Sequence, residues 1–316
     1  TSFPAGYRAT HAPEEAAQDI ARLAELNSDA DRSVRITPCS GSKNVFRLKL
    51  YRLGGSLPLS DAVPTLENFG FRVLEEVPTR LGDITDAFIH DFEVSLPAES
   101  AERLLTDSGP VESAIAAVLG GQAENDAFNR LTVDLGLKPL SVTMCRAWFR
   151  YLRQTGSSYG LLTVVDALRR APKVTAALID RFELAHDPAR QPVSDDAIAQ
   201  ADDRIIHGLD EVSAIDDDRI LRSFRGVIAA TLRTNAFSPA CAEALAFKLD
   251  SAQVPGLPKP LPWREIFVYS PRVEGIHLRA GPVARGGLRW SDRRDDFRTE
   301  ILGLMKAQRV KNAVIV

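Results

Sequence analysis

The chain has 316 residues, of which 45% are hydrophobic and 26% are charged, and its formal net charge is −3. The length suffices for two or three domains, and the composition is that of an ordinary soluble globular protein. The small net charge argues against an overall electrostatic attraction to nucleic acid or acidic membranes. Three scattered cysteines predict neither a disulfide framework nor a metal site, and no apolar run is long enough to span a membrane. These features favour the cytoplasm.

Both ends of the chain resemble cuts in a longer protein. The first residues contain no initiator Met and no signal peptide, and a run of β-branched residues stops at Val316 without a turn. We therefore expect an internal fragment.

The first third of the chain predicts a small mixed module. A helix is expected over residues 13–26, with Ala17, Ile20, Leu23 and Leu26 at helical spacing. The order strand, helix, strand, strand, helix is typical of a ferredoxin-like module with antiparallel pairing. Many such modules are small-ligand sensors of the ACT type, although a fold does not establish a ligand. We predict an ACT-like regulatory module over residues 1–97, with strands at 44–51, 71–79 and 86–96 and a helix that is capped by Ser60 and Asp61 and extends through Asn68.

The middle of the chain predicts an all-helical domain over residues 98–254. Gly and Pro residues separate its apolar periodic segments. Ser194 is a predicted helix cap, and Asp216, Asp217 and Asp218 suit a helix N-terminus, where carboxylates favour the dipole. The predicted helices cover 110–119, 122–135, 141–154, 161–170, 174–185, 195–209 and 217–234.

The last part, residues 255–316, predicts the start of a further domain. Four prolines mark an extended crossing, and strands are expected at 265–270 and 275–280. A helix capped by Ser291 or Asp292 and extending to about residue 308 follows, and then a short strand. The fold class expected for the whole chain is therefore α+β.

The most specific local feature is a turn in which Gly286 and Gly287 follow Arg285. Adjacent glycines let backbone and ligand approach closely, and a local excess of cations suits an anionic small molecule. The turn is neither a phosphate loop nor a dinucleotide fingerprint. The alternative to a binding role is a solvated helix face with scattered ion pairs, and we favour this alternative for Arg293, Arg294, Arg298 and Arg309.

This part of the chain resembles the large, bacterial type of NAD-dependent glutamate dehydrogenase. The resemblance rests mainly on three segments and extends upstream through Leu232-Arg233-Thr234-Asn235 and Tyr151-Leu152-Arg153-Gln154. The three segments are Arg285-Gly286-Gly287-Leu288-Arg289-Trp290-Ser291-Asp292, Leu302-Gly303-Leu304-Met305-Lys306, and Val310-Lys311-Asn312-Ala313.

The resemblance implies a function and a site. Smaller glutamate dehydrogenases have a lysine before the paired glycines that binds a substrate carboxylate, and Arg285 would take this role with two hydrogen bonds. Lys311, or alternatively Lys306, would be a second substrate contact, while Gly286, Gly287 and Arg289 support the turn. Residues 255–316 would be the first part of the α/β substrate-binding domain. The parent enzyme would oxidise L-glutamate to 2-oxoglutarate with NAD, as a homo-oligomer.

The same resemblance places the catalytic residues and the cofactor-binding site beyond Val316, so no such residue is expected within the chain. We expect the chain alone to be catalytically incomplete. The competing hypothesis is a regulatory or assembly protein that binds an amino acid or a partner chain through its ACT-like module. Other polar residues, including His90, Cys145 and a cluster around Asn125, favour structural roles.

Overall fold

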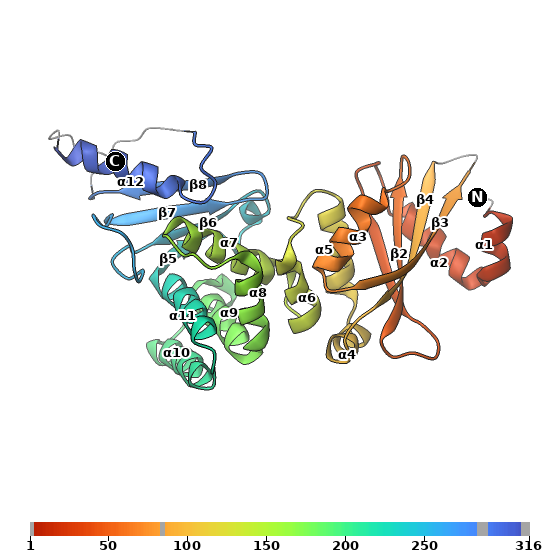
Figure 1. Cartoon of the computed structure of the whole chain (residues 1–316), viewed down its shortest axis with the longest axis horizontal. Helices are drawn as coiled ribbons and strands as arrows, with labels where there is room; N and C mark the ends of the chain where they lie inside the picture. Colours follow the sequence, from red (N-terminus) through yellow and green to blue (C-terminus); the bar gives the residue numbers. More distant parts are fainter. Residues whose placement is uncertain (1–2, 83–85, 283–289, 311–316) are drawn as a thin grey trace. The chain divides into compact units, whose positions relative to one another are not determined.

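A computed structural model describes residues 3–82, 86–282 and 290–310, without the side chains of residues 308–310. The chain divides into two compact units, Thr1–Val142 and Thr143–Val316. Each unit combines helices with one four-stranded antiparallel sheet (Figure 1). The predicted mixture of helix and sheet is thus confirmed. No helix among the described residues is long and apolar enough to cross a membrane.

The first sheet has the strand order β1-β2-β4-β3. The predicted order strand, helix, strand, strand, helix is confirmed, and β1 adds a fourth strand at the edge beside β2. The predicted cap of helix α3 is wrong, because Pro58 precedes the helix and no side chain caps it. The elements are β1 Ser33–Pro38, β2 Val45–Leu53, α3 Leu59–Asn68, β3 Arg72–Leu81 and β4 Ala87–Ser95.

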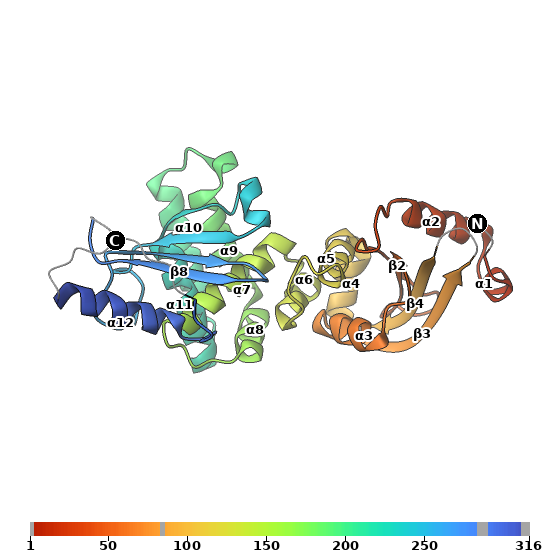
Figure 2. The same ribbon diagram turned by 90° about the horizontal axis from the view of Figure 1, so that it is seen from above.

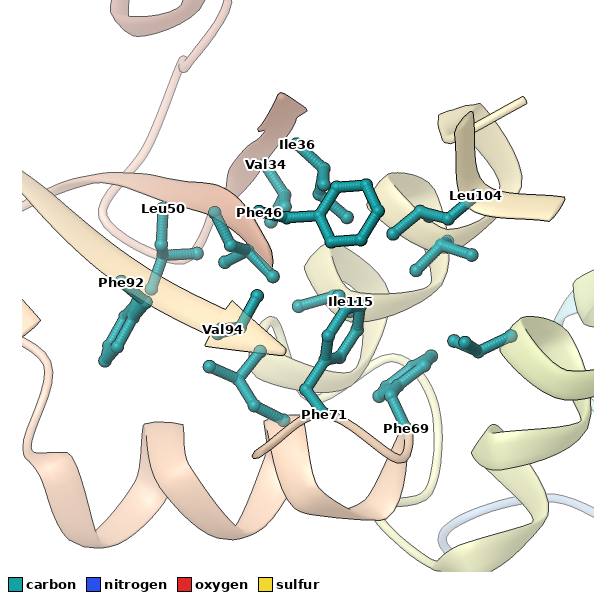
Figure 3. Packing of buried hydrophobic residues seen from close by; sticks show 14 of the residues in the cluster. Val34, Ile36, Phe46, Leu50, Phe69, Phe71, Phe92, Val94, Leu104 and Ile115 are labelled. Carbon is teal, nitrogen blue, oxygen red and sulfur yellow. The ribbon is translucent and has the colours of Figure 1, made fainter. Parts of the chain in front are cut away.

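One face of this sheet carries the main apolar core of the unit. Alternate side chains of β2 (Phe46, Leu48 and Leu50) are at most 1% exposed. They pack against α3, α4 (Ala98–Thr106) and α5 (Gly109–Leu119), as Figure 3 shows. Truncating one such buried side chain to alanine typically costs about 2–5 kcal/mol.

The opposite face of the sheet is covered by α1 (Ala5–Thr10) and α2 (Pro13–Ala24) (Figure 2). Ile20 is one of the apolar residues at helical spacing that predicted this helix, yet it is 43% exposed, whereas the neighbouring Asp19 is fully buried. The reason is the surface that α2 covers. On this face β1 and β2 present the cations of Arg35 and Lys49, and both bond Asp19.

The polar cluster around Asn125 is a structural contact. Its side chain accepts a hydrogen bond from Asn68 (2.9 Å) and donates one to Thr65 (2.9 Å), both on α3. Asp126 accepts from the backbone amide of Phe128. The helix predicted from residue 122 is therefore a loop at first. The regular elements begin later, as η1 Ala127–Asn129 and α6 Arg130–Leu135.

The second unit contains a bundle of helices around Trp148. Its ring lies 5.1 Å from that of Phe182 and 6.2 Å from that of Phe224. The predicted cap is confirmed, since Ser194 accepts from the amide of Ala197. The aspartates at 216–218 occupy the first turn of α11, as predicted. The helical elements are α7 Pro139–Gln154, α8 Leu161–Arg170, α9 Pro172–His186, η2 Pro188–Arg190, α10 Asp195–Asp210 and α11 Ile215–Ala230.

The second sheet is a meander with the order β5-β6-β7-β8. The sequence predicted β7 and β8 but missed the first two strands, because β5 continues directly from α11 and β6 has only five residues. Leu302 and Met305 of α12 pack on Leu278 of β8. The elements are β5 Thr231–Thr234, η3 Pro239–Ala242, β6 Leu245–Leu249, β7 Arg264–Tyr269, β8 Glu274–Arg279 and α12 Phe297–Val310.

Candidate functional site

The residues that the sequence singles out for substrate binding lie outside the described part of the chain. These are Arg285, Gly286, Gly287, Arg289 and Lys311. The structure describes what flanks them, namely β8 before the glycine turn and α12 after it. Lys306, the alternative second contact, is exposed on α12. The assignment of the substrate cations therefore stays a prediction.

The end of β8 is anchored on the side of the turn. The carbonyl of Arg279 accepts a hydrogen bond from the amide of Trp263 (2.6 Å), and its guanidinium donates to the carbonyl of Pro282 (2.6 Å). The guanidinium groups of Arg264 and Arg279 lie 4.8 and 5.4 Å from the centre of the Trp263 ring. Such cation–π contacts stabilise by about 0.5–1 kcal/mol at exposed positions. These contacts fix the end of β8, the strand that precedes the turn.

The segment after the turn is held by local contacts and by α7, whose Gln154 side chain donates to the carbonyl of Arg294 (2.8 Å), and it differs from the prediction. Trp290 is 80% exposed and donates to Asp292 (3.1 Å). Ser291 donates to Glu300 on α12 (2.7 Å). The predicted caps at Ser291 and Asp292 are wrong, because regular helix begins only at Phe297.

Arg298 corrects a second expectation. The sequence favoured a solvated side chain, whereas Arg298 is fully buried and its Nε donates to Glu265 on β7 (2.8 Å). Glu265 is also fully buried. By contrast Arg293 is exposed and pairs with Asp296, which raises the pKa of Arg293 and lowers that of Asp296. The sequence contained a signal that we missed. Glu265 occupies the same set of alternate, inward-facing positions of β7 as the buried Phe267 and Tyr269.

Other chemically capable groups serve structure. His90 is buried and lies between the amide of Leu57 (3.0 Å) and Glu76 (2.9 Å). Burial raises the pKa of the Cys145 thiol to about 12, so that this side chain packs as an apolar group. Among the residues that the structure describes, no three potential ligands gather as a metal site would require.

A cavity of about 500 Å³ opens where α8, α9, α10 and α11 meet. Its cations are already compensated. Arg170 pairs with Asp217 through two bonds of 2.7 Å, and Lys173 lies 3.7 Å from Glu211. The cavity therefore presents no unbalanced charge to an ionic ligand.

Four families of one group match this chain in succession. Residues 1–26 match "Glutamate dehydrogenase, helical motif 2" and residues 35–106 match "Glutamate dehydrogenase, ACT3 domain". Residues 123–188 match "Glutamate dehydrogenase, helical motif 3". Residues 204–316 match "Bacterial NAD-glutamate dehydrogenase, catalytic domain".

Curated relatives are similar over the whole chain. It is 44% identical to the NAD-specific glutamate dehydrogenase of Halomonas elongata, over 100% of this chain and 20% of the relative. Identity to the proteins of the same name from Pseudomonas aeruginosa and Mycobacterium tuberculosis is 41%, over 99% and 100% of this chain. The chain spans about a fifth of the length of these relatives, 20% in each case.

Proposed function

We propose that this chain, which belongs to the family of the large NAD-specific glutamate dehydrogenases, is part of an enzyme that converts L-glutamate and NAD to 2-oxoglutarate, ammonia and reduced cofactor. The observation that carries the proposal is the succession of four matching families along the chain, the last of them a catalytic domain. The rival hypothesis of a purely regulatory protein has no comparable support.

Within this enzyme we assign residues 285–311 to one wall of the substrate cleft. Arg285 would grip a carboxylate of glutamate with two hydrogen bonds, and the paired glycines would allow the approach. Lys311 would supply a second cation, and Arg289 would support the turn. Two cations suit a dicarboxylate because each compensates the cost of desolvating one negative charge.

NAD would supply the hydride acceptor when bound. Both sheets are antiparallel over the described residues, and neither contains the parallel β-α-β crossover that presents a dinucleotide to a helix N-terminus. The described residues therefore do not fit this cofactor, and we derive no step of the reaction through it from this chain.

The remaining parts of the proposal concern organisation. We infer three modules, over residues 1–97, 98–254 and 255–316, of which the first is an ACT-like, ferredoxin-like regulatory module and the third begins the α/β substrate domain. The family match over residues 35–106 and the strand order of the first sheet support the first assignment. We also propose a cytoplasmic homo-oligomer with a small-molecule effector at the first module.

The test uses the full-length enzyme. Replacing Arg285 or Lys311 by alanine should raise the Michaelis constant for glutamate roughly tenfold or more, because a charge-assisted hydrogen bond contributes about 1.5–3 kcal/mol and about 1.4 kcal/mol is a factor of ten. The Michaelis constant for NAD should hardly change. Arg272→Ala, at an exposed arginine, is the matched control, and Lys306→Ala tests the alternative cation. Normal glutamate kinetics in both cleft variants would refute the site assignment.

A further inference from the structure

The sheet of the second unit has one buried face and one accessible face. On the buried face, alternate residues of β6 and β7 such as Phe247, Phe267 and Tyr269 are at most 2% exposed. The residues between them point to the other side, which we call the outer face, and are only half-buried. The outer face comprises Arg233 of β5, Ala246 and Lys248 of β6, Arg264, Ile266 and Val268 of β7, and Gly275, His277 and Arg279 of β8.

One row of residues across the outer face carries cations. The strand register places Arg233, Lys248, Ile266 and His277 opposite one another on four successive strands, over three strand spacings or roughly 14 Å. Arg233 is exposed and Lys248 is half-buried. Within the described part of the chain neither cation forms an ion pair, and no outward position of β5 to β8 carries a carboxylate.

This arrangement is electrostatically unfavourable for a bare sheet. Arg233 and Lys248 lie directly opposite each other on neighbouring strands, where like charges repel. Arg264 on the same face shows how such a cation is usually compensated, since its guanidinium bonds Asp250 (2.9 Å), just after β6. Among the described residues, Arg233 and Lys248 have no such partner. Carboxylates from outside this chain would relieve the repulsion.

The neighbouring row of the outer face is apolar and open. Val268 lies between Ala246 and Gly275, two small residues, on the adjacent strands. A Cβ at Gly275 would lie 3.8 Å from the Cβ of Val268, so a larger side chain there would pack against Val268. The small neighbours therefore leave Val268 accessible, and with Ile266 it forms an apolar strip beside the cations.

These two rows define the chemistry of the partner. A second copy of the same face is excluded, because it would bring cations against cations. The partner that fits has carboxylates along one side and apolar side chains next to them. The chain spans 20% of the length of its curated relatives, so most of such an enzyme lies outside it.

We propose that the outer face is the docking surface for an acidic, amphipathic segment of the full-length enzyme from outside residues 1–316. Carboxylates of this segment pair with Arg233 and Lys248, and its apolar side chains pack on Ile266 and Val268. Such pairing turns a repulsive row into a set of charge-assisted contacts. The proposal goes beyond the glutamate site and does not depend on the role of Arg285.

The first experiment is cross-linking of the full-length enzyme with a carbodiimide, which joins an amine directly to a carboxylate in contact with it. Lys248 should be joined to an Asp or Glu of a peptide outside residues 1–316. It should also be acetylated at least about tenfold more slowly than Lys259, because a buried, paired amine is removed from solvent. Lys259 is an exposed lysine of the same unit and is the matched control. Acetylation of both lysines at the same rate, or a link from Lys248 to a carboxylate within residues 1–316, would overturn the proposal.

A charge reversal gives a second test, in which the sign of the effect decides. On a bare face, Lys248→Glu would place a carboxylate opposite Arg233, and the thermal midpoint of the full-length enzyme would hold or rise. Against an acidic partner the same change repels, so we expect the midpoint to fall by a few degrees, and to fall less for Lys248→Gln. Lys259→Glu should leave the midpoint unchanged. A midpoint that holds or rises with Lys248→Glu would refute the docking surface and leave the proposed glutamate site intact.

Discussion

The buried carboxylate of Asp19 should make a large contribution to the stability of the first unit. Asp19 lies on α2 and is fully buried against the sheet. Its oxygens accept hydrogen bonds from Lys49 (2.8 Å), Arg35 (2.9 Å) and Tyr51 (2.7 Å), and also from Tyr7. Burial, and then the hydrogen bond to Asp19, raises the pKa of Tyr7, so this hydroxyl remains a neutral donor.

The decisive substitution is Asp19→Asn, which keeps the shape of the side chain and removes its charge. One oxygen can still accept, but the new amide group is a donor and faces the donor of Lys49. Breaking a buried ion pair from one side costs about 3–5 kcal/mol. The lower end is expected here, because Glu15 also bonds Lys49 and Arg35 and keeps part of the compensation. About 3 kcal/mol is a large fraction of the usual 5–15 kcal/mol of a domain.

The assay can separate the two units because all three tryptophans, at positions 148, 263 and 290, belong to the second. Urea unfolding followed by tryptophan fluorescence therefore reports the second unit. Hydrogen exchange of the amides in α2 and β2 reports the first. With a urea slope of about 1–3 kcal/mol per molar, a loss of about 3 kcal/mol should move the midpoint of the first unit by about 1–3 M.

Glu14→Gln is the matched control, since Glu14 is exposed on the same helix. It should change the stability by no more than about 0.5 kcal/mol. Two results would refute the reasoning. One is an Asp19→Asn variant whose first unit unfolds at the same urea concentration as the control. The other is an equal shift of the tryptophan transition, which would mean that the substitution acts beyond the unit that contains it.

Two further predictions follow from pKa shifts in the second unit. Burial, and then the charge of Arg181, lowers the pKa of His186 to about 4. The unfolded chain therefore binds a proton at this histidine more readily than the folded chain, and the stability present above pH ~6.5 should be lost as the pH falls towards 4. An NMR titration of the His186 ring with a midpoint near 6.5 would contradict this prediction. The buried thiol of Cys145, with its pKa raised to about 12, should react with a thiol reagent only after unfolding, whereas the half-buried Cys39 and Cys241 should react in the native protein. The test is to count the thiols that are modified under native conditions, and Cys145→Ala should leave this number unchanged.

Local patterns predicted much of the fold. Apolar periodicity and glycine punctuation located most helices and the strands β2, β3, β4, β7 and β8. The failures have physical reasons. A helix is expected to bury its apolar side chains, but α2 covers a sheet face that carries Lys49 and Arg35, so it buries Asp19 and exposes Ile20. Short strands such as β6, with five residues, carry too few alternations to be distinguished from a loop.

In the candidate site too, residues that are adjacent in the sequence could be identified, and contacts between residues far apart in the sequence could not. The turn at Arg285 is recognisable because its chemistry is contiguous in the sequence. The cluster that holds the following segment is not, since Gln154 and Arg298 are 144 positions apart and Glu265 lies between them. Three residues that show no pattern in the sequence, a glutamine at a helix end, a glutamate in an apolar strand and one arginine among several, come together only through the fold. Their signature in sequence is a conflict with local rules, because a charged side chain occupies an inward position of β7. Such departures from local rules are expected at functional or strained sites.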